Sequence, residues 1–447
     1  MFQKVLIANR GEIAVRIIQA CRDLGIISVA VYSEADREAL HAQIADEAVC
    51  IGPARAADSY LNMDNIISAA LASGCQAIHP GFGFLSENPD FAERITQAGL
   101  AFIGPTAATI RLMGDKSEAK RNAIAAGVPV ALGTDGPLRD FDEAISEAER
   151  LGYPVMLKAA SGGGGKGIRV AESVKDLKDA YDSASAEAIA NFGDGRLYME
   201  KYIHNPRHIE VQILGDNYGN VVHLFERECS VQRRHQKLIE ESPSAFVTPE
   251  LREKMTSAAV ALAKRVGYRN AGTIEFLVDN DRNFYFCEMN TRIQVEHPVT
   301  EEVTGVDLVC EQLRVAAGEP LSFKQEDLTI RGHAIECRIN AEDPSRNFAP
   351  CPGTLVSLHL PGGPGVRVDS AAYQGYKIPP FYDSMIGKLI VYGADREQAI
   401  VRMRRALAEM LFEGVVTATD YQMHILCSKA FVEANFNVNS IANGDFD

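Results

Sequence analysis

The chain has 447 residues, of which 46% are hydrophobic and 23% are charged, and this mix excludes a fibrous or disordered protein. Its length exceeds what one hydrophobic core usually holds, so we expect two or three domains. The formal net charge of −15 disfavours nucleic acid and anionic membranes as partners, so an anionic substrate would need a local cluster of Lys or Arg.

The first hundred residues alternate between short apolar runs and helical patterns. Residues 4–8 and 27–33 are predicted strands, and residues 12–25 between them have the spacing of an amphipathic helix. This alternation is typical of a doubly wound α/β domain. A largely helical stretch, residues 106–127, follows, and we place the first domain boundary near residue 114.

Strand and turn patterns dominate the predicted central domain, which extends to residue 331. The predicted strands in it are residues 153–160, 197–203, 208–216, 221–226, 273–278 and 284–290. Beyond it, residues 332–340 form an extended stretch, six prolines between residues 350 and 380 break the chain, and residues 396–411 form a predicted helix. We predict a small α+β domain at residues 332–447.

The nine cysteines are scattered, and none are spaced as Cys-x-x-Cys, which favours reduced thiols over disulfides or a zinc site. The first apolar run, residues 5–8, is far too short for a signal-peptide core or a membrane span. We therefore expect a cytoplasmic protein.

A glycine run occupies residues 161–167, between two predicted strands, so we expect it to form the turn of a strand pair. Its backbone N–H groups could wrap a polyphosphate, with Lys158 and Lys166 supplying charge. It is not a Walker A loop, because Ala160 and Gly167 stand where that motif needs Gly and Ser or Thr. A flexible linker is the alternative interpretation.

Two glutamates mark the predicted hairpin near residue 280. If Asp279 pairs with Phe284, Glu275 and Glu288 face each other on one side of the hairpin. Opposed carboxylates repel, and a divalent cation removes that conflict. Oxygen ligands from these glutamates and Asn290 suit Mg²⁺ or Mn²⁺. The alternative is a pair of solvated carboxylates on a sheet edge.

Charged and polar residues continue at a spacing of two after this hairpin. If the chain stays extended to Pro298, the side chains of Arg292, Gln294 and Glu296 project towards one place. The planar guanidinium of Arg292 could hold a small carboxylate-like anion, and Glu296 could act as a base. A structural ion pair between Arg292 and Glu296 is the alternative.

Taken together, the motifs resemble those of biotin carboxylases of the ATP-grasp superfamily, over essentially the whole chain. The matching segments are IANRGEIA at 7–14, HPGFGFLSEN at 79–88, MGDK at 113–116, SGGGGKG at 161–167, MEKY at 199–202, QRRHQK at 232–237, EMNTRIQVEHPVTE at 288–301 and GHAIECRINAED at 332–343. Eight ordered matches are far more specific than any one of them.

The resemblance implies three domains: residues 1–114, an ATP-grasp domain at 115–331 and residues 332–447. Within the ATP-grasp domain it implies a mobile glycine-loop lid at about residues 131–203. It also implies a set of ATP contacts: Lys116, Lys158, Gly163, Gly164, Gly165, Lys166, Gly167, Glu200, Lys201, Ile203, His208, Gln232, His235 and Leu277. Without the motif, each of these histidines would more simply be a core or surface residue.

The implied reaction starts at Glu296, which takes a proton from bicarbonate held by Arg292, Gln294 and the backbone near Val295. Attack on the γ-phosphate of ATP gives carboxyphosphate, and a cation on Glu275, Glu288 and Asn290 offsets the charge.

In the second part of the implied reaction, Lys237 retains the carboxyphosphate. Phosphate released from it deprotonates biotin, and Arg338 stabilises the enolate. Two positions depart from the common family pattern: Phe82, near biotin, stands where many relatives have Tyr, and Lys166 stands where Arg is common.

The sequence has no Met-Lys-Met tripeptide to accept biotin, so we expect biotin to arrive on a separate carrier protein. The resemblance then implies the biotin carboxylase subunit of a bacterial-type acetyl-CoA carboxylase, a homodimer that works with carboxyltransferase subunits. The alternatives are the subunit of a different acyl-CoA carboxylase, another ATP-grasp ligase such as a carbamoyl-phosphate-synthase-like enzyme, and a non-catalytic nucleotide-binding scaffold. A Rossmann dehydrogenase is disfavoured, because Ser86 stands at the third glycine position of its motif.

Overall fold

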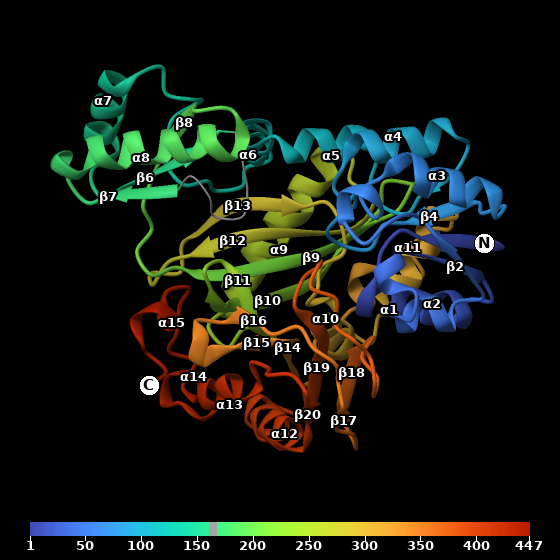
Figure 1. The fold of residues 1–447 in the computed structure, drawn as a ribbon. Coiled ribbons are helices and arrows are strands. Elements are labelled where there is room, and N and C mark those ends of the chain that lie inside the picture. Colours follow the sequence, from blue (N-terminus) through green and yellow to red (C-terminus); the bar gives the residue numbers. More distant parts are fainter. Residues whose placement is uncertain (161–167) are drawn as a thin grey trace.

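The computed structural model describes residues 1–160 and 168–447. Three regions surround a large antiparallel sheet (Figure 1): an N-terminal α/β layer, a small sheet with two helices at the opposite end, and a C-terminal layer beneath. No helix within the described part of the chain is long and apolar enough to cross a membrane.

The N-terminal region is a doubly wound α/β domain, as the sequence predicted. Its parallel sheet has the order β3-β2-β1-β4-β5, and apolar clusters lie on both faces of it. The strands are β1 Lys4–Ile7, β2 Ile27–Tyr32, β3 Glu47–Cys50, β4 Ala77–His79 and β5 Ala101–Phe102. The helices are α1 Gly11–Asp23, α2 Leu40–Ile44, α3 Met63–Ala72, α4 Pro89–Gln97 and α5 Ala107–Gly114.

The helical stretch predicted for residues 106–127 is two helices, α5 and α6 (Lys116–Ala125). Asp115 separates them, because its backbone is extended and its side chain accepts a hydrogen bond of 2.9 Å from the N–H of Glu118. This is an N-cap, which starts a new helix and gives it a new direction. Lys116 is therefore the first residue of a helix.

The small sheet has the order β7-β6-β8 and is covered by two helices. Its elements are β6 Val155–Ala159, β7 Ile168–Ala171, β8 Leu197–Lys201, α7 Phe141–Leu151 and α8 Val174–Phe192. β6 and β7 are antiparallel neighbours, so the glycine run joins a strand pair, as predicted. The run itself, including the predicted contacts Gly163, Gly164, Gly165, Lys166 and Gly167, lies outside the described residues.

The large sheet has eight strands in the order β13-β12-β9-β10-β11-β14-β19-β18. They are β9 Arg207–Gly215, β10 Val221–Arg233, β11 Gln236–Ser242, β12 Asn270–Val278, β13 Phe284–Asn290, β14 His333–Asn340, β18 Val366–Ser370 and β19 Met385–Gly393. Strands from both sides of residue 331 hydrogen-bond in this one sheet, because β11 pairs with β14. Residues on β12 and β14 are thereby held in one framework.

Helices cover both faces of the large sheet. α9 Pro249–Arg265 packs on β9 and β10, while α10 His297–Thr304 and α11 Leu308–Ala316 connect the sheet to the N-terminal region. The C-terminal helices are α12 Arg396–Glu409, α13 Thr419–Cys427, α14 Lys429–Val432 and α15 Ser440–Asn443. Two short ribbons complete this layer: β15 Glu342–Asp343 with β16 Ala349–Pro350, and β17 Ser357–His359 with β20 Leu411–Glu413.

Candidate active site

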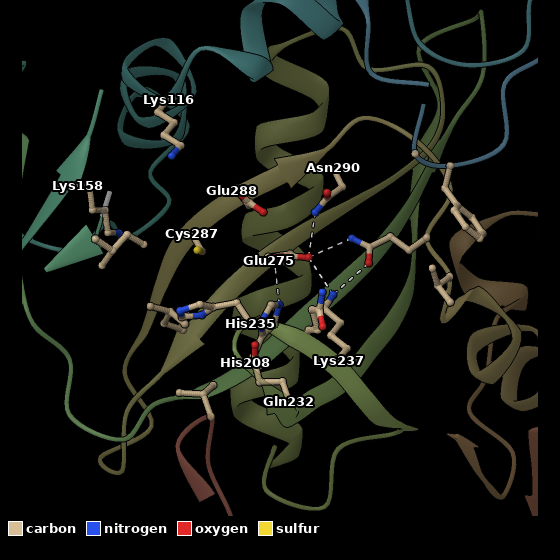
Figure 2. Close-up of a pocket in the computed structure, with 18 of the residues that line it drawn as sticks. Lys116, Lys158, His208, Gln232, His235, Lys237, Glu275, Cys287, Glu288 and Asn290 are labelled. Atoms are coloured by element: carbon tan, nitrogen blue, oxygen red, sulfur yellow. Dashed lines mark hydrogen bonds and ion pairs between the residues drawn. The ribbon is translucent and has the colours of Figure 1, made fainter. Parts of the chain in front are cut away.

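A cavity of about 960 Å³ lies where the N-terminal region, the small sheet and the large sheet meet. Every predicted site residue that the structure describes lines it. These residues are Phe82, Lys116, Lys158, Glu200, Lys201, Ile203, His208, Gln232, His235, Lys237, Glu275, Leu277, Glu288, Asn290, Arg292, Gln294, Val295, Glu296 and Arg338. Figure 2 shows Lys116 and Lys158 on one side of the cavity, with Glu275, Glu288 and Asn290 further in.

Glu275 and Glu288 are cross-strand neighbours on β12 and β13, as expected. The expected pairing of Asp279 with Phe284 is wrong, because Val278 pairs with Phe284. A bulge between Glu275 and Phe276 on one strand, and across Cys287 on the other, shifts the register by one residue. The bulge restores the alignment of the two glutamates.

The two carboxylates have different surroundings. Glu275 is 5% exposed and accepts hydrogen bonds from Asn290 (2.9 Å), Gln294 (3.1 Å) and Lys237 (3.0 Å), with His208 Nε2 at 3.1 Å. Burial raises its pKa, but the charges of Lys237 and His208 outweigh burial and hold the pKa well below the usual range. Glu275 is therefore buried and ionised, not solvated.

Glu288 faces the open part of the cavity. The charge of Glu275, together with burial, raises the pKa of Glu288. Repulsion between the paired carboxylates, together with burial, therefore outweighs the opposing charges of Lys116 and His208. A divalent cation between them would remove it, so the donor set fits Mg²⁺ or Mn²⁺.

Asn290 is already engaged on both sides of its amide. Its Nδ2 donates to Glu275, and its Oδ1 accepts a hydrogen bond of 2.9 Å from Arg292. Arg292 also donates to Glu87 over 2.8 Å. The alternative of a structural ion pair between Arg292 and Glu296 is wrong, because Glu296 has other partners.

Glu296 lies between two cations. Its Oε1 is 2.6 Å from Lys237 Nζ, and its Oε2 is 2.9 Å from a guanidinium nitrogen of Arg338. Burial opposes ionisation, but the charges of Lys237, Arg338 and Arg227 lower the pKa of Glu296 far below its usual range. The carboxylate is therefore ionised and can accept a proton, although the cations that hold it make it a weak base in this state.

Lys237 is the centre of the charge network. Its Nζ lies 2.6 Å from Glu210, 3.0 Å from Glu275, 2.6 Å from Glu296 and 3.1 Å from the Gln294 side-chain oxygen. Burial lowers the pKa of this lysine, but the three carboxylates together raise it well above its usual value. Lys237 is thus a fixed positive charge between the metal-type carboxylates and the candidate base.

The chain between β13 and α10 is not extended as predicted. It bends after Asn290 and turns at Val295 and Glu296, and α10 begins at His297 with Pro298 in its first turn. Proline suits this position because its missing N–H is not needed there. The side chains of Arg292, Gln294 and Glu296 still reach the cavity, but a turn and not a strand delivers them.

The other end of the cavity carries lysines and apolar groups. Lys158 on β6 pairs with Glu200 on β8, and Lys120 lies 3.4 Å from the same carboxylate. Burial lowers the pKa of Lys158, but Glu200 outweighs burial and raises it. Lys201 donates to the carbonyl oxygens of Gly152 (2.8 Å) and Tyr153 (2.9 Å). Ile203, Leu277 and Cys287 line this end as well.

A two-residue turn joins β10 to β11 and carries His235. Arg233 pairs with Gln236, and the residues between them, Arg234 and His235, have φ values of 49° and 63°. Positive φ at both positions is typical of a type I′ turn, which usually contains Gly or Asn. Neither residue has that freedom, so the local strain is tolerated at a site where side chains line a cavity.

Several residues of the site were not predicted. Glu210, Glu240 and Glu87 contact predicted residues, Cys287 lines the cavity, and Arg227 pairs with Glu210 behind them. The spacing of His208 and Glu210 within the buried strand β9 was a usable signal, since charged side chains in a buried strand need partners. The contact of Glu87 with Arg292 spans 205 residues and left no local signal.

An antiparallel sheet with paired carboxylates, faced by a small sheet with lysines, defines the ATP-grasp class of enzymes. Three family models match consecutive parts of the chain: "Biotin carboxylase, N-terminal domain" (residues 1–110), "Carbamoyl-phosphate synthase L chain, ATP binding domain" (115–324) and "Biotin carboxylase C-terminal domain" (336–443). The two flanking matches favour biotin carboxylase over the carbamoyl-phosphate-synthase-like alternative.

Full-length relatives agree. Biotin carboxylase 1 of Bacillus subtilis (strain 168) is 56% identical over 446 residues, covering 100% of this chain and 99% of that protein. One of the pyruvate carboxylase subunits of Methanothermobacter thermautotrophicus is 56% identical over 96% of this chain and 88% of that protein.

Among solved structures, a biotin carboxylase domain dimer of 2-oxoglutarate carboxylase from Hydrogenobacter thermophilus has a TM-score of 0.96 and 51% identity. It covers 100% of this chain and 99% of that chain, and its crystal contains MgADP, ADP and bicarbonate. The chain belongs to the biotin carboxylase family and is therefore an enzyme of the ligase type.

Proposed function

We propose that this enzyme carboxylates biotin on a separate carrier protein, using ATP and bicarbonate with carboxyphosphate as the intermediate. The observation that carries the proposal is the convergence of Glu275 and Glu288, Glu296 and Arg338 in one cavity. We assign residues 1–114 to the N-terminal domain, 115–331 to the ATP-grasp domain with its lid at about 131–203, and 332–447 to the C-terminal domain.

ATP occupies the end of the cavity between the small and large sheets in this proposal. Lys116 and Lys158 contact its phosphates, and the glycine run with Lys166 covers them. Adenine lies at the hinge formed by Glu200, Lys201 and Ile203 with Leu277, and His208, Gln232 and His235 line the rest of the nucleotide site. The relative from Hydrogenobacter thermophilus, which was crystallised with ADP, supports a nucleotide site in this fold.

The metal site is formed by Glu275 and Glu288, with Asn290 beside them. A bound Mg²⁺ or Mn²⁺ would neutralise charge on the transferring phosphoryl group. The raised pKa of Glu288 supports this assignment, since Lys116 and His208 only partly offset the charge of Glu275 and the effect of burial. The Oδ1 of Asn290 accepts one hydrogen bond from Arg292, and its second lone pair could bind a cation.

Bicarbonate binds against Arg292, Gln294 and the backbone at Val295. Glu296 takes its proton, and the resulting oxygen attacks the γ-phosphate in line with the leaving ADP. Glu296 is held by Lys237 and Arg338 at rest, so substrate binding exchanges one of these contacts for one to the anion. Lys237 then retains the anionic carboxyphosphate by electrostatic attraction.

Biotin enters on the side of Arg338 and Phe82. Phosphate released from carboxyphosphate, with loss of CO₂, takes the ureido proton, and Arg338 stabilises the enolate oxygen that forms. Its guanidinium is supported by Glu240 at 2.6 Å, which fixes its orientation. Phe82 supplies an apolar contact and no hydroxyl group.

We further propose that the chain is the biotin carboxylase subunit of an acetyl-CoA carboxylase, a homodimer serving a biotin carboxyl carrier protein and carboxyltransferase subunits in fatty acid synthesis. Full-length identity to Biotin carboxylase 1 of Bacillus subtilis supports a biotin carboxylase subunit, and the choice of acetyl-CoA carboxylase rests on the resemblance of the motifs. A second candidate is the corresponding subunit of a pyruvate carboxylase, favoured by equal identity to the relative from Methanothermobacter thermautotrophicus.

The core reaction is tested by ¹⁴C-bicarbonate incorporation into free biotin with ATP and Mg²⁺, together with ADP release. We expect bicarbonate-dependent ATP hydrolysis that biotin stimulates. Turnover that is indifferent to biotin would favour a different ATP-grasp ligase. The acceptor is tested by adding carrier protein and carboxyltransferase from the same genome: malonyl-CoA from acetyl-CoA supports the first assignment, and oxaloacetate from pyruvate supports the second.

A further inference from the structure

The backbone N–H groups of Val295 and Glu296, at the turn before α10, have no hydrogen-bond acceptor among the described residues. Within residues 1–160 and 168–447, neither N–H donates a hydrogen bond to the protein. Both residues line the cavity. Backbone N–H groups in such places ordinarily have a partner, and two successive free amides suit an anion.

The carbonyl groups of the same peptide units are held firmly on the other side. Nδ1 of His297 lies 2.7 Å from the carbonyl oxygen of Gln294, and Nζ of Lys388 lies 2.9 Å from that of Val295. His297 and Lys388 are both 0% exposed, and neither lines the cavity. Each side chain therefore contacts a backbone carbonyl on the side of the turn that faces away from the cavity.

Peptide geometry links the two observations. In a planar trans peptide, the carbonyl of one residue and the N–H of the next point in opposite directions. The Gln294–Val295 and Val295–Glu296 peptides are trans. Holding the first carbonyl at His297 turns the Val295 N–H away from that ring, and holding the second at Lys388 turns the Glu296 N–H away from the ammonium. Both amides are thereby directed to the cavity side.

We propose that His297 and Lys388 are positioning residues that fix these two peptide planes, so that the amides of Val295 and Glu296 bind the oxygens of the one-carbon anion. The inference rests on the proposed function, since it concerns the bicarbonate pocket. Arg292 supplies positive charge to that pocket, and the two N–H groups orient the bound anion through directional hydrogen bonds.

The surroundings of His297 fix it as a neutral donor. Burial, together with the nearby cations Lys388, Arg16 and Arg367, holds the pKa of His297 well below its usual range. A neutral imidazole carries one proton, and the carbonyl oxygen of Gln294 requires that proton on Nδ1.

The surroundings of Lys388 fix it as a charged donor. Its Nζ is 3.2 Å from Glu12 and 3.9 Å from Asp369. Burial lowers the pKa of Lys388, but Glu12, Glu336 and Asp369 outweigh burial and raise it. The ammonium group can therefore hold the Val295 carbonyl throughout the neutral pH range.

The test compares His297→Leu with His297→Asn, because the side-chain amide of Asn can donate from the place of Nδ1. We expect His297→Leu to raise KM for bicarbonate about tenfold, which is roughly 1.4 kcal/mol. KM for ATP should stay within about twofold, and His297→Asn should recover most of the loss, as expected for one restored hydrogen bond.

His41→Leu is the matched control. His41 is also 0% exposed, and its Nε2 lies 3.2 Å from the carbonyl oxygen of Val31, away from the cavity. Its loss should lower the melting temperature as His297→Leu does, with no change in KM for bicarbonate. If His297→Leu does not fold, the double variant Lys388→Met with Glu12→Gln removes the other carbonyl contact without leaving the Glu12 carboxylate unpaired.

The outcomes separate the two proposals. A wild-type enzyme without bicarbonate-dependent turnover would end the proposed function. The positioning role would be overturned if the wild type is active and both variants, His297→Leu and Lys388→Met/Glu12→Gln, fold and keep the normal KM for bicarbonate. Equal increases in KM for ATP and for bicarbonate would also overturn it, because they indicate a general structural defect.

Discussion

The ammonium nitrogen of Lys237 lies 2.6 Å from Oε1 of Glu296, and the same lysine touches Glu275 at 3.0 Å. One cation thus connects the candidate base with the carboxylate of the candidate metal site. Both carboxylates are buried, so solvent screens their electrostatic interaction with Lys237 only weakly. Binding of a cation at Glu275 is therefore expected to alter the charge balance at Glu296.

Replacing Glu296 should separate chemistry from nucleotide binding. We expect Glu296→Ala to lower biotin carboxylation by about 10²–10⁴-fold, the usual effect of losing a general base. ATP affinity, measured by calorimetry, should stay within about threefold, since Glu296 contacts Lys237 and Arg338 and not the lysine-rich end. Glu296→Gln, which keeps the shape, should be equally inactive. A large loss of ATP affinity in both variants would contradict the role of base.

Arg338 should be required for the second half of the reaction only. We expect Arg338→Gln to retain bicarbonate-dependent ATP hydrolysis and to lose its stimulation by biotin, because the enolate loses its counter-charge. Arg338→Lys should recover little, since one ammonium group cannot serve both Glu240 and Glu296 as the guanidinium does. The measurement is ADP release with and without biotin. Persistent stimulation in Arg338→Gln would rule out this assignment.

The carboxylate pair should determine metal affinity. Glu275→Gln and Glu288→Gln should each weaken Mn²⁺ binding by about tenfold or more, as loss of an anionic ligand from a hard-cation site implies. Binding can be followed by electron paramagnetic resonance in the presence of a non-hydrolysable ATP analogue. Glu93→Gln, which removes an exposed carboxylate on α4 that pairs with Arg111, is the control and should bind normally. Unchanged affinity in both test variants would place the metal elsewhere.

A buried ion pair in the C-terminal layer predicts a pH-dependent stability. Glu241 accepts hydrogen bonds from Arg396 (2.7 and 3.1 Å) and lies 2.7 Å from Nε2 of His333. Burial raises its pKa, but these partners outweigh burial and lower the pKa to about 2. The folded-state value lies below the unfolded one, so the stabilisation is present above about pH 4.5 and is lost as the pH falls towards 2.

We therefore expect Glu241→Gln to be less stable than the wild type at pH 7, by up to roughly 3 kcal/mol. The difference in melting temperature should shrink as the pH is lowered below 4.5, because the wild-type carboxylate is then progressively protonated. Glu397→Gln, at an exposed position of α12, should match the wild type at every pH. A constant difference between wild type and Glu241→Gln from about pH 7 to about pH 3 would contradict the assigned cause.

Much of the fold could be predicted from the sequence, because the spacing of apolar residues shows which side of a strand or helix is buried. The strand at residues 4–8 and the helix after it were predicted within one or two residues of β1 and α1. The break at Asp115 was missed, since a polar residue inside a helical pattern can be a cap or a solvent-facing position. The continuity of the large sheet across residue 331 depends on long-range pairing of β11 with β14, which has no local signature.

The sequence predicted which residues line the site, but it did not predict which of them contact one another. The opposition of Glu275 and Glu288 was deduced from a wrong pairing, because a bulge compensates for the one-residue error at the hairpin end. The turn at Val295 was missed because residues 292–296 alternate as a strand would. Glu87, Glu210 and Glu240 reach the site from distant segments, so only the folded structure shows that they pair with Arg292, Lys237 and Arg338, respectively.

The single extra residue at Cys287 has a consequence for anyone who redesigns this hairpin. Deleting it would make β13 match β12 residue for residue from the turn onwards, and Glu288 would still lie opposite Glu275, because these two residues already pair in the present ladder. Straightening the bulge without deleting a residue would instead set Cys287 opposite Glu275 and turn Glu288 to the other face of the sheet. The cation site would then lose a ligand that is still in the sequence, so an irregularity of the backbone is as much a part of the metal site as its carboxylates.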